Sequence, residues 1–95
     1  MIKRLVKMTF KPEHVQDFIT IFNSNKDLIS SFEGCSHVEL LQDIDNENTF
    51  FTYSLWDDPK YLEVYRHSEL FKTVWTSTKV LFDAKPEAWS VNRIS

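Results

Sequence analysis

The stretch TFFTYSLWDDPKYLEVYRHSELF, residues 49–71, contains the change from strand-like to helical patterning that decides the fold. Residues 49–56 are dense in aromatic and β-branched side chains, which favour a β-strand. Asp58 followed by Pro59 is typical of the N-cap and first position of a helix. After them, apolar and aromatic residues recur at helical spacing, namely Tyr61, Val64, Tyr65, Ser68, Phe71, Trp75, Thr78 and Phe82. The stretch predicts a strand, an acidic turn and a helical region with a break near residues 67–68.

The flanking segments predict the other elements of a small fold. Alternating apolar residues predict a strand over residues 2–10, and an amphipathic pattern predicts a helix over residues 12–31. Residues 35–43 alternate in part and precede the polar turn DIDNEN, so they are expected to pair with residues 49–56 as a hairpin. A last strand is expected over residues 88–94.

The predicted order is β-α-β-β-α-β, which is the α+β, ferredoxin-like arrangement of an antiparallel sheet with both helices on one face. Gly34 is the only glycine among 95 residues and follows the first helix, where it suits a left-handed stop. A chain of this length is normally one domain, so residues 1–95 are expected to form a single unit.

The third strand predicts an uncovered apolar face. Phe50 and Trp56 share one face of the strand, and Phe51, Tyr53 and Leu55 share the other. Helices on one side of the sheet can cover only one of these faces. We therefore expect a homodimer that packs through its sheet faces.

Composition excludes several classes of function. The net charge is −3 with Lys and Arg scattered among Asp and Glu, so no basic stripe is available for nucleic acid. No apolar run is long enough to span a membrane, and the start of the chain does not look like a signal peptide. The single cysteine, Cys35, agrees with a reducing compartment. We expect a cytoplasmic protein with no nucleic-acid or membrane partner.

The chain resembles the antibiotic biosynthesis monooxygenase (ABM) family, small ferredoxin-like proteins that assemble as dimeric α/β barrels. The resemblance rests on the Pro-initiated first helix with Phe18, on FEGC before the second strand, on FFTYSLWDDPKYLEVYRHSELF, and on EAWSV in the last strand. It covers almost the whole chain, so residues 1–95 are identified as a single ABM-like domain.

The resemblance implies a small-molecule enzyme whose cavity lies between the helices and the sheet. Family members oxidise polycyclic phenols or quinols without metal or flavin, open haem, or isomerise small metabolites. The haem-opening members use an Asn, a Trp and a His, and these positions hold Lys7 or its neighbour, Tyr65 and Trp75 here. The iron-binding histidine is missing, which disfavours haem degradation. A histidine common in the quinol-oxidising members falls on Leu70.

Oxidation of a phenol or quinol without a cofactor requires a base, a flat apolar slot and a hydrogen-bond donor for the resulting anion. His67 or His37 is the expected base because imidazole titrates near neutral pH. Tyr65 or Ser68 is the expected donor. The slot is expected to be lined by Tyr65, Trp75, Phe51 and Phe71. With these residues, the resemblance implies a cofactor-independent monooxygenase that acts on a small aromatic substrate.

Other interpretations are compatible with the same residues. The aromatic residues of the second helical region are also typical of an ordinary core. If His37 and His67 both face solvent, a non-catalytic dimeric module that binds a small molecule is favoured instead. An isomerase of a small metabolite would require a more polar cavity. Cys35, His37 and Glu39 share one face of a strand, but they do not complete a tetrahedral metal site, and no metal is expected.

Overall fold

The computed structural model describes residues 1–95 and contains four strands, three α-helices and one short 3₁₀ turn. In chain order these are β1 (Ile2–Thr9), η1 (Pro12–His14), α1 (Val15–Ser30), β2 (Cys35–Gln42), β3 (Thr49–Trp56), α2 (Pro59–Arg66), α3 (Glu69–Lys79) and β4 (Glu87–Val91). The last strand ends before the expected Ile94. The last strand ends at Val91 because Val91 pairs with Lys3, and β1 has only one residue, Ile2, before Lys3.

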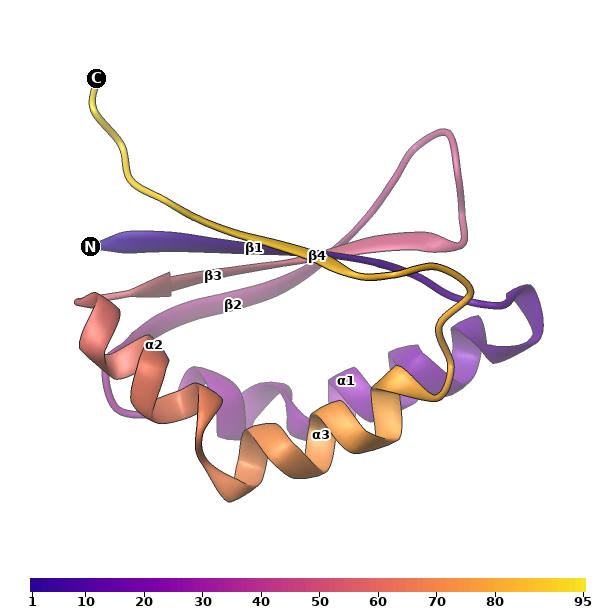
Figure 1. The fold of residues 1–95 in the computed structure, drawn as a ribbon, viewed down its shortest axis with the longest axis horizontal. Helices are drawn as coiled ribbons and strands as arrows, with labels where there is room; N and C mark the ends of the chain where they lie inside the picture. The colour runs from indigo at the N-terminus through magenta and orange to yellow at the C-terminus, as the bar shows by residue number, and fades with distance from the viewer.

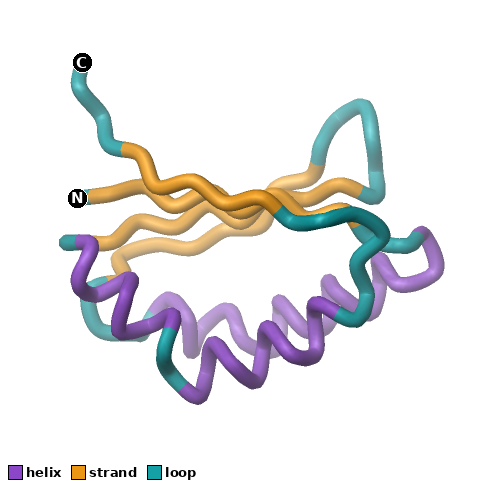
Figure 2. Tube along the Cα trace, in the orientation of Figure 1, coloured by secondary structure: helices purple, strands orange, loops and turns teal.

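The four strands form one antiparallel sheet in the order β2-β3-β1-β4. The helices lie together on one face of this sheet, with both chain termini at the same end of the molecule (Figure 1). The turn between β2 and β3 extends away from the helices (Figure 2). This arrangement confirms the predicted α+β, ferredoxin-like fold, and β1 occupies a central position in the sheet.

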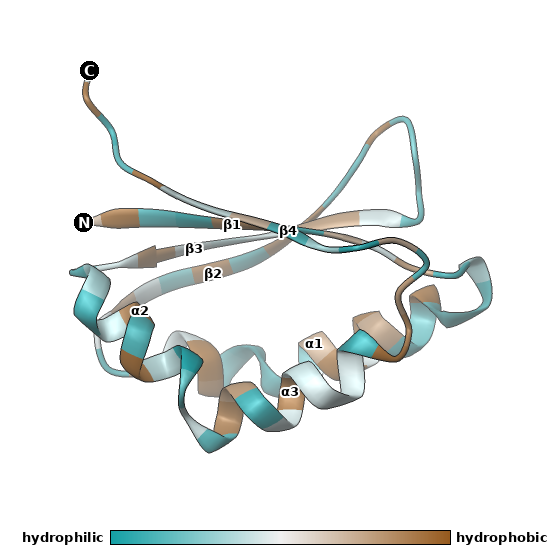
Figure 3. Cartoon of the chain, in the orientation of Figure 1, coloured by the Kyte–Doolittle hydropathy of each residue, from teal (hydrophilic) through white to brown (hydrophobic).

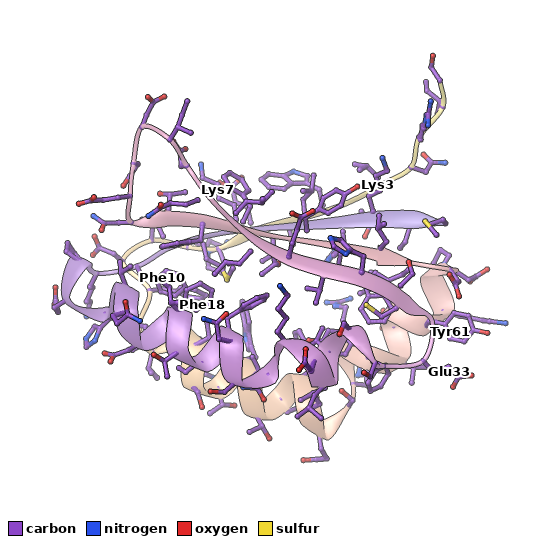
Figure 4. The ribbon with its side chains drawn as sticks, turned by 180° about the vertical axis from the view of Figure 1, so that it is seen from behind. Lys3, Lys7, Phe10, Phe18, Glu33 and Tyr61 are labelled. Carbon is purple, nitrogen blue, oxygen red and sulfur yellow. The ribbon has the colours of Figure 1, made fainter.

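The core lies between the sheet and the helices. Its buried residues are Met8, Phe10, Phe18, Phe22, Ile29, Val38 and Phe50. Phe10, which directly follows β1, and Phe18 of α1 lie in the space between the two layers (Figure 4), with ring centroids 4.1 Å apart. The even-numbered residues at the end of β1 therefore face the helices, as their alternation predicts.

The helix boundaries follow from local capping. The side chain of Asp58 accepts a hydrogen bond from the backbone N–H of Lys60 at 3.0 Å, and Pro59 occupies the first helical position of α2. The hydroxyl of Ser68 accepts from the N–H of Phe71 at 3.1 Å and caps α3. This second cap divides the region into two helices and confirms the break predicted near residues 67–68.

Gly34 joins α1 to β2 in a conformation that other residues rarely adopt. Its φ is +85°, so the left-handed stop expected from the sequence is confirmed. Space is also restricted here, because a Cβ atom at this position would lie 2.2 Å from Cγ of Tyr61 in α2. The glycine thus allows α2 to pack directly against the start of β2.

The face of the sheet away from the helices is rich in apolar side chains. Lys3 and Lys7 project from this face (Figure 4), and their strand partners Leu55 and Phe51 share it because paired residues point the same way. Trp89 pairs with Leu5 in the same manner, and its side chain is 42% exposed. Figure 3 shows that hydrophobic residues occur along the strands. The helices cover only one face of the sheet, so they cannot cover side chains that point to the other face. The predicted uncovered apolar face is therefore present in the chain.

Candidate functional site

A cavity of about 360 Å³ lies between the sheet and the helices. This volume falls in the range of sites that bind small molecules. Apolar side chains from β1, β2 and all three α-helices form most of its lining, including Val6, Val38, Ile21, Leu62 and Val74. Pro86, Glu87 and Ala88 also line the cavity, and the last two are exposed residues of β4, so solvent reaches the lining at the start of this strand.

One wall of the cavity is aromatic. Tyr65 of α2 lies between Trp56 and Phe71, with ring centroids 5.1 and 5.3 Å away. Phe71 in turn stacks on Trp75, with centroids 5.9 Å apart and planes at 9°. Three residues expected in the slot, Tyr65, Phe71 and Trp75, therefore line the same cavity. The flat pair from α3 can accept an aromatic ring by stacking or edge contact.

The phenol of Tyr65 is held in its neutral form. Burial among the aromatic rings raises its pKa to about 12, and the nearby Cys35 adds to the shift because a thiolate there would repel a tyrosinate. A phenol that keeps its proton can donate a hydrogen bond to a ligand oxygen. Tyr65 is therefore suited to the expected role of donor, although not to that of a base.

The raised pKa of Tyr65 predicts a loss of stability in alkali. The folded chain keeps this proton up to about pH 12, whereas the unfolded chain releases it near pH 10, so the free energy of unfolding falls as pH rises between these values. The two-unit difference corresponds to about 3 kcal/mol. Urea denaturation from pH 8 to pH 12 should show a smaller fall for Tyr65→Phe than for the wild type. Parallel curves for the two proteins would contradict the shift.

The two candidate bases lie outside the cavity. His67 follows the last turn of α2, where its Nε2 is 2.8 Å from Oε1 of Glu63 and its side chain is 74% exposed. His67 is two positions after Tyr65, and two positions correspond to about 200° of rotation around a helix. The side chain of His67 therefore cannot point into the cavity as that of Tyr65 does. His37 lies on the outer face of the sheet, 3.2 Å from Glu39, because its neighbour Val38 faces the core. The histidine base expected in the cavity is therefore absent from it.

Two further expected contacts are also displaced from the cavity. Phe51 lies on the outer face of β3, since its neighbours Phe50 and Thr52 face the helices. Ser68 does not line the cavity, because its hydroxyl caps α3 and donates to the carbonyl oxygen of Tyr65 at 2.6 Å. Its role in the structure is the helix cap.

Sequence reasoning missed two arginines that line the cavity. Arg4 shares a strand face with Val6 and Met8, and its Nη1 donates to Oγ of Ser90 at 3.0 Å. Burial lowers the pKa of Arg4, and repulsion from Arg66 lowers it further. The signal was available in the alternation of β1, where Arg4 occupies a core-facing position.

The structure contains no group of three or more His, Cys, Asp or Glu side chains that could hold a metal ion.

The thiol of Cys35 donates a hydrogen bond to the carbonyl oxygen of His37 at 3.5 Å. Burial raises the pKa of this thiol. No helix is long and apolar enough to cross a membrane.

Comparison with known proteins agrees with this architecture. A family model described as "Antibiotic biosynthesis monooxygenase" matches residues 1–76. Two curated archaeal relatives, each named "Putative heme-binding protein", are 33% identical in Haloarcula marismortui and 30% identical in Natronomonas pharaonis. Each match extends over 76 residues, or 79% of this chain. It spans only 11% and 13% of the relatives, which are therefore much longer proteins.

Solved structures share the fold across nearly the whole chain. A conserved protein from Methanosarcina mazei superposes with a TM-score of 0.92 at 24% identity, covering 97% of this chain and 91% of the other. A structure named antibiotic biosynthesis monooxygenase gives a TM-score of 0.92 at 15% identity, with both chains covered completely. The match of the family model to most of the sequence goes beyond this likeness of fold and shows that the chain belongs to the antibiotic biosynthesis monooxygenase family.

Proposed function

We propose that the chain is a cofactor-independent monooxygenase that oxidises a small aromatic phenol or quinol. The observation that supports this function is the apolar cavity of about 360 Å³, with the Phe71–Trp75 pair and the Tyr65 phenol in its lining. Membership of the family supports the same class of reaction. The proposal goes beyond the family assignment by naming the substrate class and the residues that bind it.

In this mechanism the substrate ring lies against Phe71 and Trp75, and its oxygen accepts a hydrogen bond from Tyr65. That bond stabilises the phenolate form. The lining contains no imidazole, and its one carboxylate, Glu87, belongs to the exposed strand β4, so the proton leaves to solvent along that strand. The phenolate then transfers an electron to O₂. One oxygen atom enters the ring to give a quinone and the other leaves as water, so the substrate supplies all the electrons.

Oxygen uptake by the purified, metal-stripped chain tests this function. Polycyclic phenols and hydroquinones should be consumed one for one with O₂. Tyr65→Phe should lower kcat by about 10²-fold, as expected for the loss of one donor to an oxyanion. His37→Ala and His67→Ala serve as matched controls and should retain the wild-type rate, because both side chains lie outside the cavity. Loss of turnover in either histidine variant, or no uptake above background, would contradict the proposed mechanism.

The absence of a histidine from the cavity favours one alternative, a non-catalytic dimeric module that binds the same kind of ligand. The two functions differ in a single experiment. A module would bind the phenol, as measured by quenching of tryptophan fluorescence, without consuming O₂. An isomerase of a small polar metabolite receives no support from the largely apolar lining.

The names of the two archaeal relatives raise the question of haem. The lining of the cavity contains neither histidine nor cysteine, which are common ligands of haem iron. Tyr65, the one phenol in the lining, keeps its proton and packs between aromatic rings. The residues present therefore do not fit haem, and the proposed reaction involves none.

The apolar outer face of the sheet supports the proposal of a homodimer. Light scattering at micromolar concentration should report twice the chain mass of 11.3 kDa. Phe51→Asp places a charge on this face and should give a monomer. Ile44→Asp is the matched control, because Ile44 is 97% exposed in the turn between β2 and β3 and should leave the dimer intact. A monomeric wild-type chain would contradict packing through the sheet.

A further inference from the structure

A second, more polar cavity adjoins the apolar cavity and shares part of its lining. The second cavity has a volume of about 280 Å³ and lies between the start of α2 and the paired ends of β1 and β4. Three residues, Arg4, Leu62 and Arg66, line both cavities. The two arginines therefore lie at the boundary between an apolar space and a polar one.

The positive charge at this boundary is only partly compensated. Arg4 is partly buried and forms no ion pair, and its one side-chain hydrogen bond is to the hydroxyl of Ser90. Arg66 donates to Oε2 of Glu63 at 3.3 Å, while Oε1 of the same carboxylate is 2.8 Å from Nε2 of His67. Glu63 is the only carboxylate that lines the second cavity. Among the residues that line the second cavity, two guanidinium groups and one carboxylate leave one excess positive charge. Glu87, the carboxylate in the lining of the apolar cavity, pairs with Lys7 across the strands.

A partly buried guanidinium without an anionic partner is unfavourable, because desolvation is not offset by a paired charge. Arginine also presents several N–H donors in a planar fork that matches a carboxylate. A single excess charge suits a monoanion better than a phosphate dianion, which Glu63 would repel. The position of the pair requires a ligand with an apolar body on one side and an anionic group on the other.

We propose that Arg4 and Arg66 bind a carboxylate of the ligand while its aromatic ring occupies the apolar cavity. The substrate class is then an aromatic hydroxy acid, with the hydroxyl near Tyr65 and the carboxylate at the arginines. This inference rests on the proposed function for the hydroxyl that reacts. The carboxylate site itself does not require turnover.

Binding of matched probes tests the site. The probes are 6-hydroxy-2-naphthoic acid, its uncharged carboxamide and 2-naphthyl phosphate, titrated into the full chain at pH 7 by calorimetry. The wild type should bind the acid about 10- to 100-fold more tightly than the amide, as expected for a hydrogen-bonded charge pair. Arg4→Gln should remove this preference by weakening the binding of the acid much more than that of the amide. Lys79→Gln removes the same charge from an exposed position outside both cavities and should keep the preference.

Three results would overturn the site: equal affinities of the wild type for acid and amide, equal weakening of both probes in Arg4→Gln, or tighter binding of the phosphate than of the acid. Thermal melting of each variant shows that it is folded, and Arg66→Gln provides a second variant if Arg4→Gln is not. Oxygen uptake separates the two proposals. If the chain prefers the acid but consumes no O₂, the carboxylate site is supported and the monooxygenase is contradicted. If the chain consumes O₂ but does not prefer the acid, the monooxygenase is supported and the carboxylate site is contradicted.

Discussion

Phe10→Ala is expected to lower the free energy of unfolding by about 3–5 kcal/mol, which is the usual cost of removing a buried phenylalanine. The Phe10 side chain is 0% exposed and lies at the junction of three parts of the chain. Its ring stacks on Phe18 of α1 at 4.1 Å and contacts Phe50 of β3 and Phe82, which follows α3, at 6.1 and 5.3 Å. The cavity left by alanine would have walls from all three, so it cannot close by the movement of one element.

Urea denaturation at pH 7 measures this loss. Phe10→Leu keeps much of the volume and should lose less, which protects the comparison if the alanine variant is unfolded. The control is Leu28→Ala on α1, because Leu28 is 59% exposed and its replacement should change stability by no more than about 0.5 kcal/mol. A loss for Phe10→Ala as small as that of the control would contradict the central place of this residue.

Gly34→Ala is expected to destabilise the chain by about 2–5 kcal/mol, through two separate effects. The φ of +85° costs about 1–2 kcal/mol for a residue with a side chain. In addition, the new Cβ would lie 2.2 Å from Cγ and 2.3 Å from Cβ of Tyr61, so α2 must shift, at a cost of about 1–3 kcal/mol.

A double-mutant cycle separates the two effects of Gly34→Ala. In the Tyr61→Gly background the ring and the Cβ of residue 61 are both removed while the backbone strain at position 34 remains, so Gly34→Ala should cost less there than in the wild type. Equal costs in the two backgrounds, measured by urea denaturation, would show that the contact with Tyr61 does not contribute.

The fold could be predicted from the sequence because its boundaries are encoded locally. The Asp58–Pro59 pair and Ser68 supply caps through their own side chains, and Gly34 supplies a conformation that no other residue type adopts easily. Alternation along β3 distinguishes its two faces. Such signals depend on neighbours in sequence and need no knowledge of distant contacts.

The candidate site was predicted only in part. Tyr65, Phe71 and Trp75 follow helical spacing and line the cavity together. His67 was included for its chemistry, although its position on the helix turns it to solvent. Arg4 was not predicted because it is a charged residue at a position where the alternation of β1 indicates an apolar one. Its proximity to Arg66 depends on how α2 packs against the sheet, which the sequence does not indicate.

The strand order has a consequence for how the chain acquires its structure. β1 is made first but pairs with β3 and β4, with Ile2 opposite Trp56 and Lys3 opposite Val91. Only the hairpin of β2 and β3 joins strands that are neighbours in sequence. Folding that depends on such distant pairings is slow compared with that of helical bundles of similar size. During synthesis, β1 therefore has no strand partner until β3 and then β4 have been made. The sheet cannot be complete until the last strand has emerged from the ribosome.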